Sequence, residues 1–319
     1  MSHHIVELRD VFFNYPDGTE TLRGISFRIT HGESVGIVGA NGAGKSTLLL
    51  QMNGYLRPSG GTITIGDLQL SRQSRKEIRK KVGLVFQNPD DQLFMPTVFD
   101  DVAFGPLNLG LEPGKVRERV DTALAIVGCL GLKDKPPHHL SSGQKSAVAI
   151  ASVIAMQPDI LVMDEPASSL DPRGRRQLIH LLRDFRHTKI IASHDLDFIL
   201  DVCERCIVIK EGRVMADGRT GEILSDRTLL EANHLELPLS MQKPGLNHSR
   251  GGNMDDLKKL EHLIGHWKEH NSEHAETYRD WAKKADSLGR KELSDILLEI
   301  ADKTLGLEKL FEKASGLCR

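Results

Sequence analysis

The run GANGAGKST carries the most specific chemical pattern in this 319-residue sequence. It fits the spacing G-x-x-x-x-G-K-[ST], follows the apolar run SVGIV and precedes the helix-forming run TLLLQMNG. Glycines let the backbone approach a polyphosphate closely, while N–H groups at a helix N-terminus supply hydrogen-bond donors and partial positive charge. The pattern predicts a nucleotide site built from Gly39, Ala40, Asn41, Gly42, Ala43, Gly44, Lys45, Ser46 and Thr47. Lys45 adds a positive charge at the β- and γ-phosphates, and Ser46 is a candidate Mg²⁺ ligand.

A second pattern is ILVMDEP, an apolar run that ends in Asp164 and Glu165. Side chains alternate along a strand, so two adjacent carboxylates cannot have the same role. Asp164 suits outer-shell coordination of Mg²⁺, and Glu165 is placed to polarise an attacking water. Beside a phosphate-binding loop, this pair predicts hydrolysis of the bound nucleotide.

Short apolar runs that alternate with longer amphipathic ones must position these motifs. The alternation predicts an α/β fold with a parallel sheet covered by helices. Expected strands are residues 34–38, 82–86, 160–163 and 189–193, and each ends where a polar motif begins. Ligands of open α/β sheets bind beyond the carboxyl ends of the strands, so the chemistry is expected there. The run IVIKEGRVMADG predicts a β-hairpin that turns at Glu211 and Gly212.

Composition divides the chain into two parts. Every proline lies at or before Pro244, and 26 of the last 66 residues are charged. We expect one domain at 1–237, a linker at 238–253 rich in Gly, Pro, Ser and Asn, and a second domain at 254–319. The net charge of −2 argues against a dedicated nucleic-acid or membrane-surface binder, and no run of 18 apolar residues predicts a membrane span. Because Cys203 and Cys206 lack a second ligand pair, we do not assign them a zinc or redox site.

Further motifs follow in order: Tyr15 in FNYP, Gln87 after VGLVF, LSSGQ, SSLD, and His194 in ASHD. With GANGAGKS and ILVMDE, they make residues 4–237 resemble the nucleotide-binding subunit of ATP-binding-cassette (ABC) transporters. The resemblance implies a P-loop ATPase fold with a helical subdomain, and ATP and Mg²⁺ as its cofactors. Tyr15 is then expected to stack on adenine, Gln87 to contact Mg²⁺ and the attacking water, and His194 to hydrogen-bond the γ-phosphate. Tyr15 as a strand-packing residue is the structural alternative.

The resemblance also implies a dimer with a second ATPase subunit, either another copy or a paralogue, because LSSGQ caps the ATP that the other subunit binds. The expected contacts come from Ser141, Ser142, Gly143 and Gln144, and Asp171 is expected to link the two sites. The sequence departs from the usual LSGGQ followed by a basic pair, since it has Ser142 and then Lys145, Ser146 and Ala147. The departure puts the rate of turnover, rather than the catalytic set, in question.

Residues 87–111 resemble the energy-coupling-factor group of importers, and FGPLNLGL is most similar to their cobalt/nickel ATPases. This implies a peripheral subunit on the cytoplasmic face of the cell membrane, with a transmembrane coupling subunit and a membrane substrate-binding subunit as partners, and no nucleic acid. Two interpretations remain open for its apolar residues, a docking groove for a coupling helix or the core of the helical subdomain: Leu93, Phe94, Met95, Val98 and Phe99. Two alternatives for the function are vitamin uptake and a non-transport ABC protein that acts on nucleic acid or ribosomes.

The tail from Met254 is expected to form an all-α domain. Apolar and polar residues at alternating three- and four-residue steps predict one helical seam: Leu257, Leu260, Ile264, Trp267, Asn271, His274, Tyr278, Trp281, Ala285 and Leu288. The helix is expected to end at Leu288-Gly289, and a second apolar run from Leu293 to Phe311 favours an antiparallel hairpin or a swapped four-helix dimer. Four histidines recur every four residues: His262, His266, His270 and His274. A transition-metal pair at His270 and His274 and a solvated row with one polar seam residue are both compatible with this spacing, because the row drifts around the helix.

Overall fold

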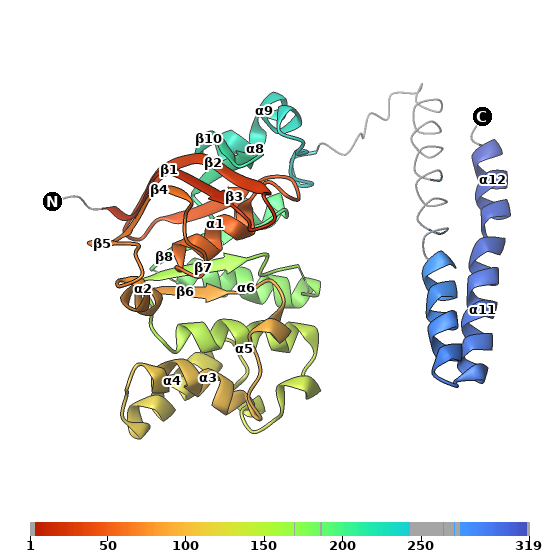
Figure 1. The fold of residues 1–319 in the computed structure, drawn as a ribbon, viewed down its shortest axis with the longest axis horizontal. Helices are drawn as coiled ribbons and strands as arrows, with labels where there is room; N and C mark the ends of the chain where they lie inside the picture. Colours follow the sequence, from red (N-terminus) through yellow and green to blue (C-terminus); the bar gives the residue numbers. More distant parts are fainter. Residues whose placement is uncertain are drawn as a thin grey trace. The chain divides into compact units, whose positions relative to one another are not determined.

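The computed structural model describes residues 4–168, 170–185, 187–242, 264, 271 and 275–317 (Figure 1). The chain divides into two compact units, residues 1–242 and 243–319. Each unit is described by itself below. Within the described ranges, no helix is both long and apolar enough to cross a bilayer.

A six-stranded sheet forms the centre of the first unit, in the order β10-β9-β3-β8-β7-β6. Its strands are β3 (Ser34–Val38), β6 (Val82–Val85), β7 (Ile160–Asp164), β8 (Thr188–Ala192), β9 (Arg205–Lys210) and β10 (Arg213–Arg219). All neighbours are parallel except β9 and β10, which form a hairpin through Glu211 and Gly212, both with positive φ. The predicted α/β fold, its parallel strands and this turn are confirmed.

A second, four-stranded antiparallel sheet was not predicted from the sequence. It has the order β2-β1-β4-β5, with β1 (His4–Asn14), β2 (Glu20–Thr30), β4 (Gly60–Ile65) and β5 (Leu68–Gln69). One face of β2 is buried through Ile25, Phe27 and Ile29, while Ser26 and Arg28 alternate with them on the exposed face. This period-two burial is typical of an antiparallel sheet with one solvated face.

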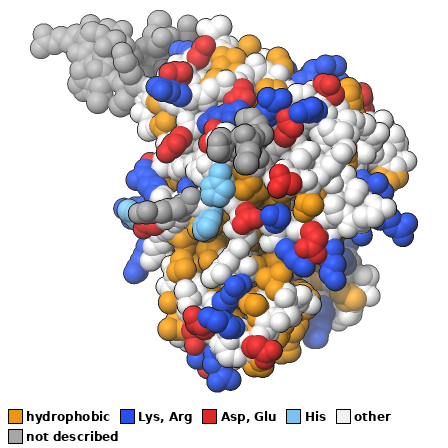
Figure 2. Space-filling model, turned by 90° about the vertical axis from the view of Figure 1, so that its left-hand side faces the viewer, with side chains coloured by type: hydrophobic (Ala, Val, Ile, Leu, Met, Phe, Trp, Pro, Cys, Tyr) orange, Lys and Arg blue, Asp and Glu red, His pale blue; other side chains and the backbone are white. Residues whose placement is uncertain are grey.

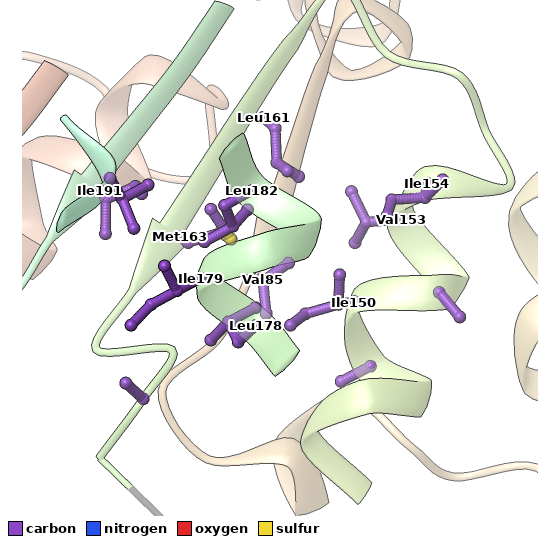
Figure 3. Close-up of a cluster of buried hydrophobic side chains, with 14 of the residues drawn as sticks. Val85, Ile150, Val153, Ile154, Leu161, Met163, Leu178, Ile179, Leu182 and Ile191 are labelled. Carbon is purple, nitrogen blue, oxygen red and sulfur yellow. The ribbon is translucent and has the colours of Figure 1, made fainter. Parts of the chain in front are cut away.

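Two hydrophobic cores lie on opposite faces of the central sheet. Along β7, Ile160 and Val162 join the core shared with the antiparallel sheet and α1 (Lys45–Met52), while Leu161 and Met163 join the core on the helical side. In the helical-side core, Met163 lies among Leu178, Ile179 and Leu182 (Figure 3). Burial on both faces explains why the central strands read as continuous apolar runs.

The helices of the first unit cover the central sheet and form a helical subdomain. Their bounds are α2 (Arg75–Lys81), α3 (Val98–Asn108), α4 (Pro113–Ile126), α5 (Ser142–Ile154), α6 (Pro172–Asp184), α7 (Leu196–Val202), α8 (Thr220–Ser225) and α9 (Arg227–Ala232), with short 3₁₀ turns at Pro89–Asp91, Leu130–Leu132 and Pro137–His139. In Figure 1, α3, α4 and α5 lie together beyond the β6 edge of the sheet. The predicted helical subdomain is therefore present.

The second unit contains an antiparallel helical hairpin. Helical residues 275–287 end at Leu288-Gly289, where Gly289 has a φ of 72°, and α11 (Lys291–Gly306) and α12 (Glu308–Gly316) follow. Ser294 Oγ donates to Ala282 O at 2.9 Å, and Asn271 Nδ2 donates to Thr304 O at 2.6 Å. Ala282, near the turn, thus contacts Ser294, and Asn271, farther from the turn, contacts Thr304. The two helical segments therefore run in opposite directions, as predicted.

The contact face of this hairpin agrees with the predicted seam at Ile264, Asn271 and Ala285 and differs from it at other positions. Small residues are buried between the helices: Ala275, Ala282, Ala285, Ser294 and Ala301. Trp281 and Leu288, expected in the seam, are 56% and 71% exposed. Trp281 directly precedes the buried Ala282, and one residue corresponds to 100° of helical rotation, so the indole is turned away from the contact face. His262, His266, His270 and His274 lie outside the described residues, so their proposed metal pair is untested.

Candidate active site

The strand register brings the predicted motifs to one edge of the central sheet. Ile37 of β3 and Asp164 of β7 both pair with Ala192 of β8, and Met163 of β7 pairs with Val85 of β6. The segments that follow these four parallel strands therefore leave the sheet side by side. They carry the glycine-rich loop, Glu165, His194 and Gln87, in agreement with the rule that ligands bind beyond carboxyl strand ends.

The glycine-rich loop curls around the start of α1. Gly44 is the residue before this helix and has a φ of 103°, and a Cβ atom there would lie 2.9 Å from Leu22 Cδ2. Only glycine fits both the backbone and the space. Lys45 is buried, and its Nζ donates to Gly39 O at 2.7 Å and to Ala40 O at 3.2 Å. The ammonium of Lys45 thus lies against the carbonyls of the first two residues of the loop.

Asp164 and Ser46 form a cluster of oxygen atoms beside this loop. Asp164 Oδ1 is buried and has no hydrogen-bond partner among the residues that the structure describes. The pKa of Asp164 is raised, mainly by burial and further by the nearby charge of Glu165. A hydrogen bond from Ser46 and the charge of Lys45 oppose this rise. Burial lowers the pKa of Lys45, and Glu165 and Asp164 act against that decrease. A buried carboxylate oxygen without a donor, next to a hydroxyl, fits a hard divalent cation such as Mg²⁺.

Glu165 is held in a strained backbone conformation. Its φ is 47°, a region that non-glycine residues seldom adopt, and its carboxylate is buried. Oε2 accepts from Ser193 Oγ at 2.9 Å, and Oε1 accepts from the His194 backbone N–H at 2.9 Å. His194 Nδ1 also lies 2.9 Å from Oε2, and the His194 side chain is 62% exposed. These contacts orient the carboxylate before any substrate binds.

Sequence reasoning missed three residues that position this cluster. Ser193 donates to Glu165, and its own Oγ accepts from the Asp195 backbone N–H at 3.1 Å. Asp195 also accepts two hydrogen bonds from Arg175, at 3.0 and 3.2 Å, so α6 is tied to the start of α7. The hydroxyl of Ser193, adjacent to His194 in ASHD, was a signal that could have been used.

The other predicted site residues lie at the rim. The Tyr15 hydroxyl is 3.0 Å from Thr47 Oγ1, and the Tyr15 ring meets Phe13 edge to face, so the side chain contacts both the loop and the strand. Gln87 is exposed and lies two residues after the end of β6. Asp171 caps α6 by accepting from the Gly174 N–H at 2.6 Å.

LSSGQ forms the beginning of α5. Ser141 and Gln144 make a reciprocal capping box, in which Ser141 Oγ accepts from Gln144 N and Gln144 Oε1 accepts from Ser141 N. Lys145 Nζ lies 2.6 Å from Asp90 Oδ1, which connects this helix to the segment after Gln87. Ser146 is buried, and its hydroxyl donates to Ser142 O, so the departure from a basic pair leaves small side chains on this face of α5.

The segment after Gln87 divides its apolar residues between two environments. Leu93 and Val98 are buried in the helical-side core and Phe99 packs against it, whereas Phe94 is 65% exposed. The Phe94 ring meets the exposed Phe104 ring of α3 edge to face, with centroids 5.2 Å apart. The core interpretation therefore applies to Leu93, Val98 and Phe99, and docking stays a prediction for the exposed Phe94.

Asp101 fixes the backbone of this segment. Its Oδ1 accepts from the N–H groups of Phe94 and Met95 at 3.0 and 3.1 Å. Gln92 adds a second anchor, because it accepts from Phe86 N and donates to Ala149 O of α5. The exposed aromatic pair is consequently presented by a well-anchored loop.

Cys203 and Cys206 are buried, and burial raises the pKa of each thiol to about 12. Cys206 lies in β9 and Cys203 ends α7, so both contribute to the helical-side core. Both thiols are protonated at neutral pH.

The glycine-rich loop, the acidic end of a strand and a histidine that follows the next strand meet at one edge of a parallel sheet. This arrangement defines a P-loop nucleotide hydrolase. A family profile described as ABC transporter matches residues 22–168. A putative ABC transporter ATP-binding protein of Geobacter sulfurreducens is 64% identical over 242 residues, 76% of this chain and 97% of the relative. An energy-coupling factor transporter ATP-binding protein, EcfA, of Methanocaldococcus jannaschii is 48% identical over 74% of this chain and 86% of its own length.

Solved structures agree with the sequence relatives. The cbiO1 protein of Clostridium perfringens, part of the ABC transporter complex cbiONQ, is 41% identical with a TM-score of 0.65, over 72% of this chain and 94% of its own. A dimeric ATP-binding cassette, MJ0796, bound to ADP and Pi, is 27% identical with a TM-score of 0.62, over 67% of this chain and 98% of its own. The chain belongs to the ATP-binding proteins of ABC transporters, a family of ATPases.

The tail matches a different family. Residues 260–318 fit a profile described as a domain of unknown function, DUF8180. The Geobacter sulfurreducens relative is matched over 97% of its length by 76% of this chain, so it has no counterpart of about a quarter of the sequence. The tail is an addition to a standard cassette.

Proposed function

We propose that this chain is the ATP-hydrolysing subunit of an energy-coupling-factor importer that carries Co²⁺ or Ni²⁺. The relatives named EcfA and the similarity to cbiO1 support the importer class. The observation that carries the proposal is the exposed Phe94–Phe104 pair, which follows Gln87 on an anchored segment. An apolar pair at this place fits a helix from a membrane subunit.

The glycine-rich loop holds the triphosphate in this proposal. Backbone N–H groups of residues 39–47 surround the phosphates, and Lys45 exchanges its two loop carbonyls for β- and γ-phosphate oxygens. Tyr15, which lies against Thr47, stacks on the adenine ring.

Mg²⁺ fits the oxygen cluster at the loop. Ser46 and Gln87 would supply oxygen ligands, and Asp164 would take part through its buried, unpartnered Oδ1. A cation held there would supply positive charge beside the phosphates.

Glu165 orients and polarises the attacking water. Its carboxylate is preorganised by Ser193 and by the His194 backbone, so no rearrangement of the strand end is needed. The exposed His194 ring contacts the γ-phosphate and holds the site closed.

A second ATPase subunit completes each site. Ser141 and the N–H groups of Ser142, Gly143 and Gln144 lie at the N-terminus of α5, where a helix favours an anionic partner. In the dimer they donate to the γ-phosphate bound by the opposite subunit, and Asp171 connects the two sites.

Docking can be tested by purifying the full chain from the membranes of cells that produce it and identifying the membrane subunits that co-purify. We expect Phe94→Ser and Phe104→Ser to lose these subunits while ATP binding is retained. Ile126→Ser is the matched control, because Ile126 is an exposed apolar residue of α4 in the same subdomain. If both aromatic variants still retain the membrane subunits, the docking site is elsewhere.

The cargo is decided by transport into proteoliposomes that contain the purified complex. ATP-dependent accumulation of radioactive Ni²⁺ or Co²⁺, lost in Glu165→Gln, is the expected result. Accumulation of a vitamin instead would retain the importer class and contradict the metal cargo. Co-sedimentation with ribosomes in place of membrane subunits would contradict the importer itself.

A further inference from the structure

A row of exposed apolar side chains runs along α11 and α12. Its members follow alternating three- and four-residue steps, with Lys303 and the small Ala314 at the two positions that lack a large apolar residue: Leu293, Ile296, Ile300, Leu307, Leu310 and Leu317. Each is at least 40% exposed, and Leu317 is 78% exposed. Six large apolar residues in coiled-coil spacing form a seam, which we call the outer seam, that nothing covers within the described part of this unit.

The hairpin already uses a different face of the same helices. Ser294 and Ala301 are buried against the first helix, and each directly follows a member of the outer seam, Leu293 and Ile300. One residue corresponds to 100° of helical rotation, so the outer seam is turned by that angle from the face inside the hairpin. The hairpin therefore cannot bury both faces of α11.

The first helix extends the same apolar surface. Trp281 directly precedes the buried Ala282, as Leu293 precedes Ser294. In two antiparallel right-handed helices, a step of one residue back from the inner face turns both side chains toward the same side of the hairpin. The exposed Trp281 and, one heptad later, Leu288 thus lie on the side that carries the outer seam.

The charges on α11 and α12 select the orientation of a second copy. Parallel pairing would place Lys303 against Lys303 of the other chain, which is unfavourable. Antiparallel pairing centred near residue 305 places Ile300 opposite Leu310 and Lys303 opposite Leu307. It also places Glu299 beside Lys313 of the second copy, so opposite charges meet at both ends of the pair. Lys303 already contacts Glu299 at 2.7 Å, so its ammonium stays at the solvent edge while its methylenes cover the seam.

We propose that two tails of this protein pair through their outer seams into an antiparallel four-helix bundle that holds two ATPase subunits together. Charge complementarity and the interruption by a single lysine favour a second copy of the tail over another apolar partner. The pairing rests on the proposed function, in which two copies of this chain dimerise as the similar cassette does, so that two tails belong to one assembly. A permanent link raises the effective concentration of one cassette for the other after each round of hydrolysis.

Analytical ultracentrifugation of the full chain without nucleotide tests the pairing. We expect a dimer for the wild type and a monomer for Leu307→Glu. Leu298→Glu is the matched control, because Leu298 lies outside the seam on α11 and both leucines are 43% exposed. Circular dichroism confirms that each variant remains helical. A monomeric wild type, or equal effects of the two substitutions, overturns the proposal.

Cysteine cross-linking tests the orientation. In a Cys318→Ser background the remaining thiols are buried, and copper–phenanthroline oxidation of Ile300→Cys/Leu310→Cys is expected to give a covalent dimer. Ile300 lies in α11 and Leu310 in α12, ten residues later, and ten residues of helix rise about 15 Å, so the bond can form only between chains. Ile300→Cys alone is expected to stay monomeric on a non-reducing gel. Efficient cross-linking of that single variant would instead show parallel pairing and overturn the proposed arrangement.

The pairing also predicts a functional readout. The ATPase activity per molecule of the wild type is expected to stay constant on dilution, while that of Leu307→Glu falls because its cassettes separate between cycles. Lys303→Leu, which completes the seam, is expected to shift the sedimentation equilibrium further toward dimer. Loss of dimer in Lys303→Leu contradicts the placement of this residue in the interface.

Discussion

Glu165 concentrates the chemistry of the site in one strained residue. Its positive φ is maintained by a hydrogen bond from its own N–H to Ala192 O at 2.9 Å and by the three groups that hold its carboxylate. Strain of this kind persists where the surrounding structure over-determines the backbone. The position of the Glu165 carboxylate therefore depends on β8 as much as on β7.

Replacing Glu165 by Gln tests its role at the residue scale. The amide retains the shape and one acceptor oxygen but cannot take up a proton, so we expect phosphate release to fall about 10²- to 10⁴-fold with ATP affinity within about threefold of wild type. Phosphate release and equilibrium ATP binding are the two measurements. Unchanged hydrolysis would assign the base to another group.

Patterns along the chain identified the chemically active residues but not their supports. Glu165, Lys45 and His194 follow from motif spacing and resemblance, because each has a neighbour in sequence that reveals its context. Ser193, Asp195 and Arg175 act through contacts over 20 or more residues, and nothing in their local spacing indicates these partners. Only the pairing of β7 with β8 and the packing of α6 beside α7 bring them together.

At the scale of elements, Arg175 connects α6 to the loop that carries His194. Both its hydrogen bonds reach the carboxylate of Asp195, which also caps α7 by accepting from Phe198 N. A planar guanidinium can make this paired contact and an ammonium cannot. The position of α6, which Asp171 caps, therefore influences the position of the loop that carries His194.

Arg175→Lys is expected to lower kcat by about threefold to tenfold, because the paired contact with Asp195 is lost. A tenfold loss corresponds to about 1.4 kcal/mol of transition-state stabilisation. Arg176→Lys, a change at the neighbouring exposed position, is the control and should leave kcat unchanged. Steady-state ATPase assays and thermal unfolding separate positioning from stability. Equal kcat values for the two variants would remove Arg175 from the positioning role.

At the scale of the whole molecule, the proposed sites need two subunits. We expect Lys45→Ala and Gly143→Asp each to be inactive alone, and a one-to-one mixture to recover a fraction of wild-type ATPase activity. In the mixed dimer, the intact loop of one chain meets the intact LSSGQ of the other. A Cβ atom at Gly143 makes only an ordinary 3.7 Å contact with Leu170, so this substitution preserves the fold.

The mixture separates two arrangements. If LSSGQ acted on ATP in its own chain, each variant would retain one defect and mixing would restore nothing. Activity that rises with the mixed fraction and peaks near equal amounts supports the shared site. The titration is measured by phosphate release at constant total protein.

The sequence by itself determined the α/β class, the nucleotide motif, the acidic strand end and the helical tail, because all of these depend on neighbours in the chain and on helix or strand periodicity. Only the tertiary structure decided which apolar residues after Gln87 are core and which are exposed, since burial depends on packing between distant segments. It likewise decided that Ala282 faces the second helix while Trp281, the preceding residue, lies at the surface. Periodicity identifies an apolar face, but the rotation of a helix against its neighbour decides which residues of that face lie inside, and this rotation depends on packing between distant segments.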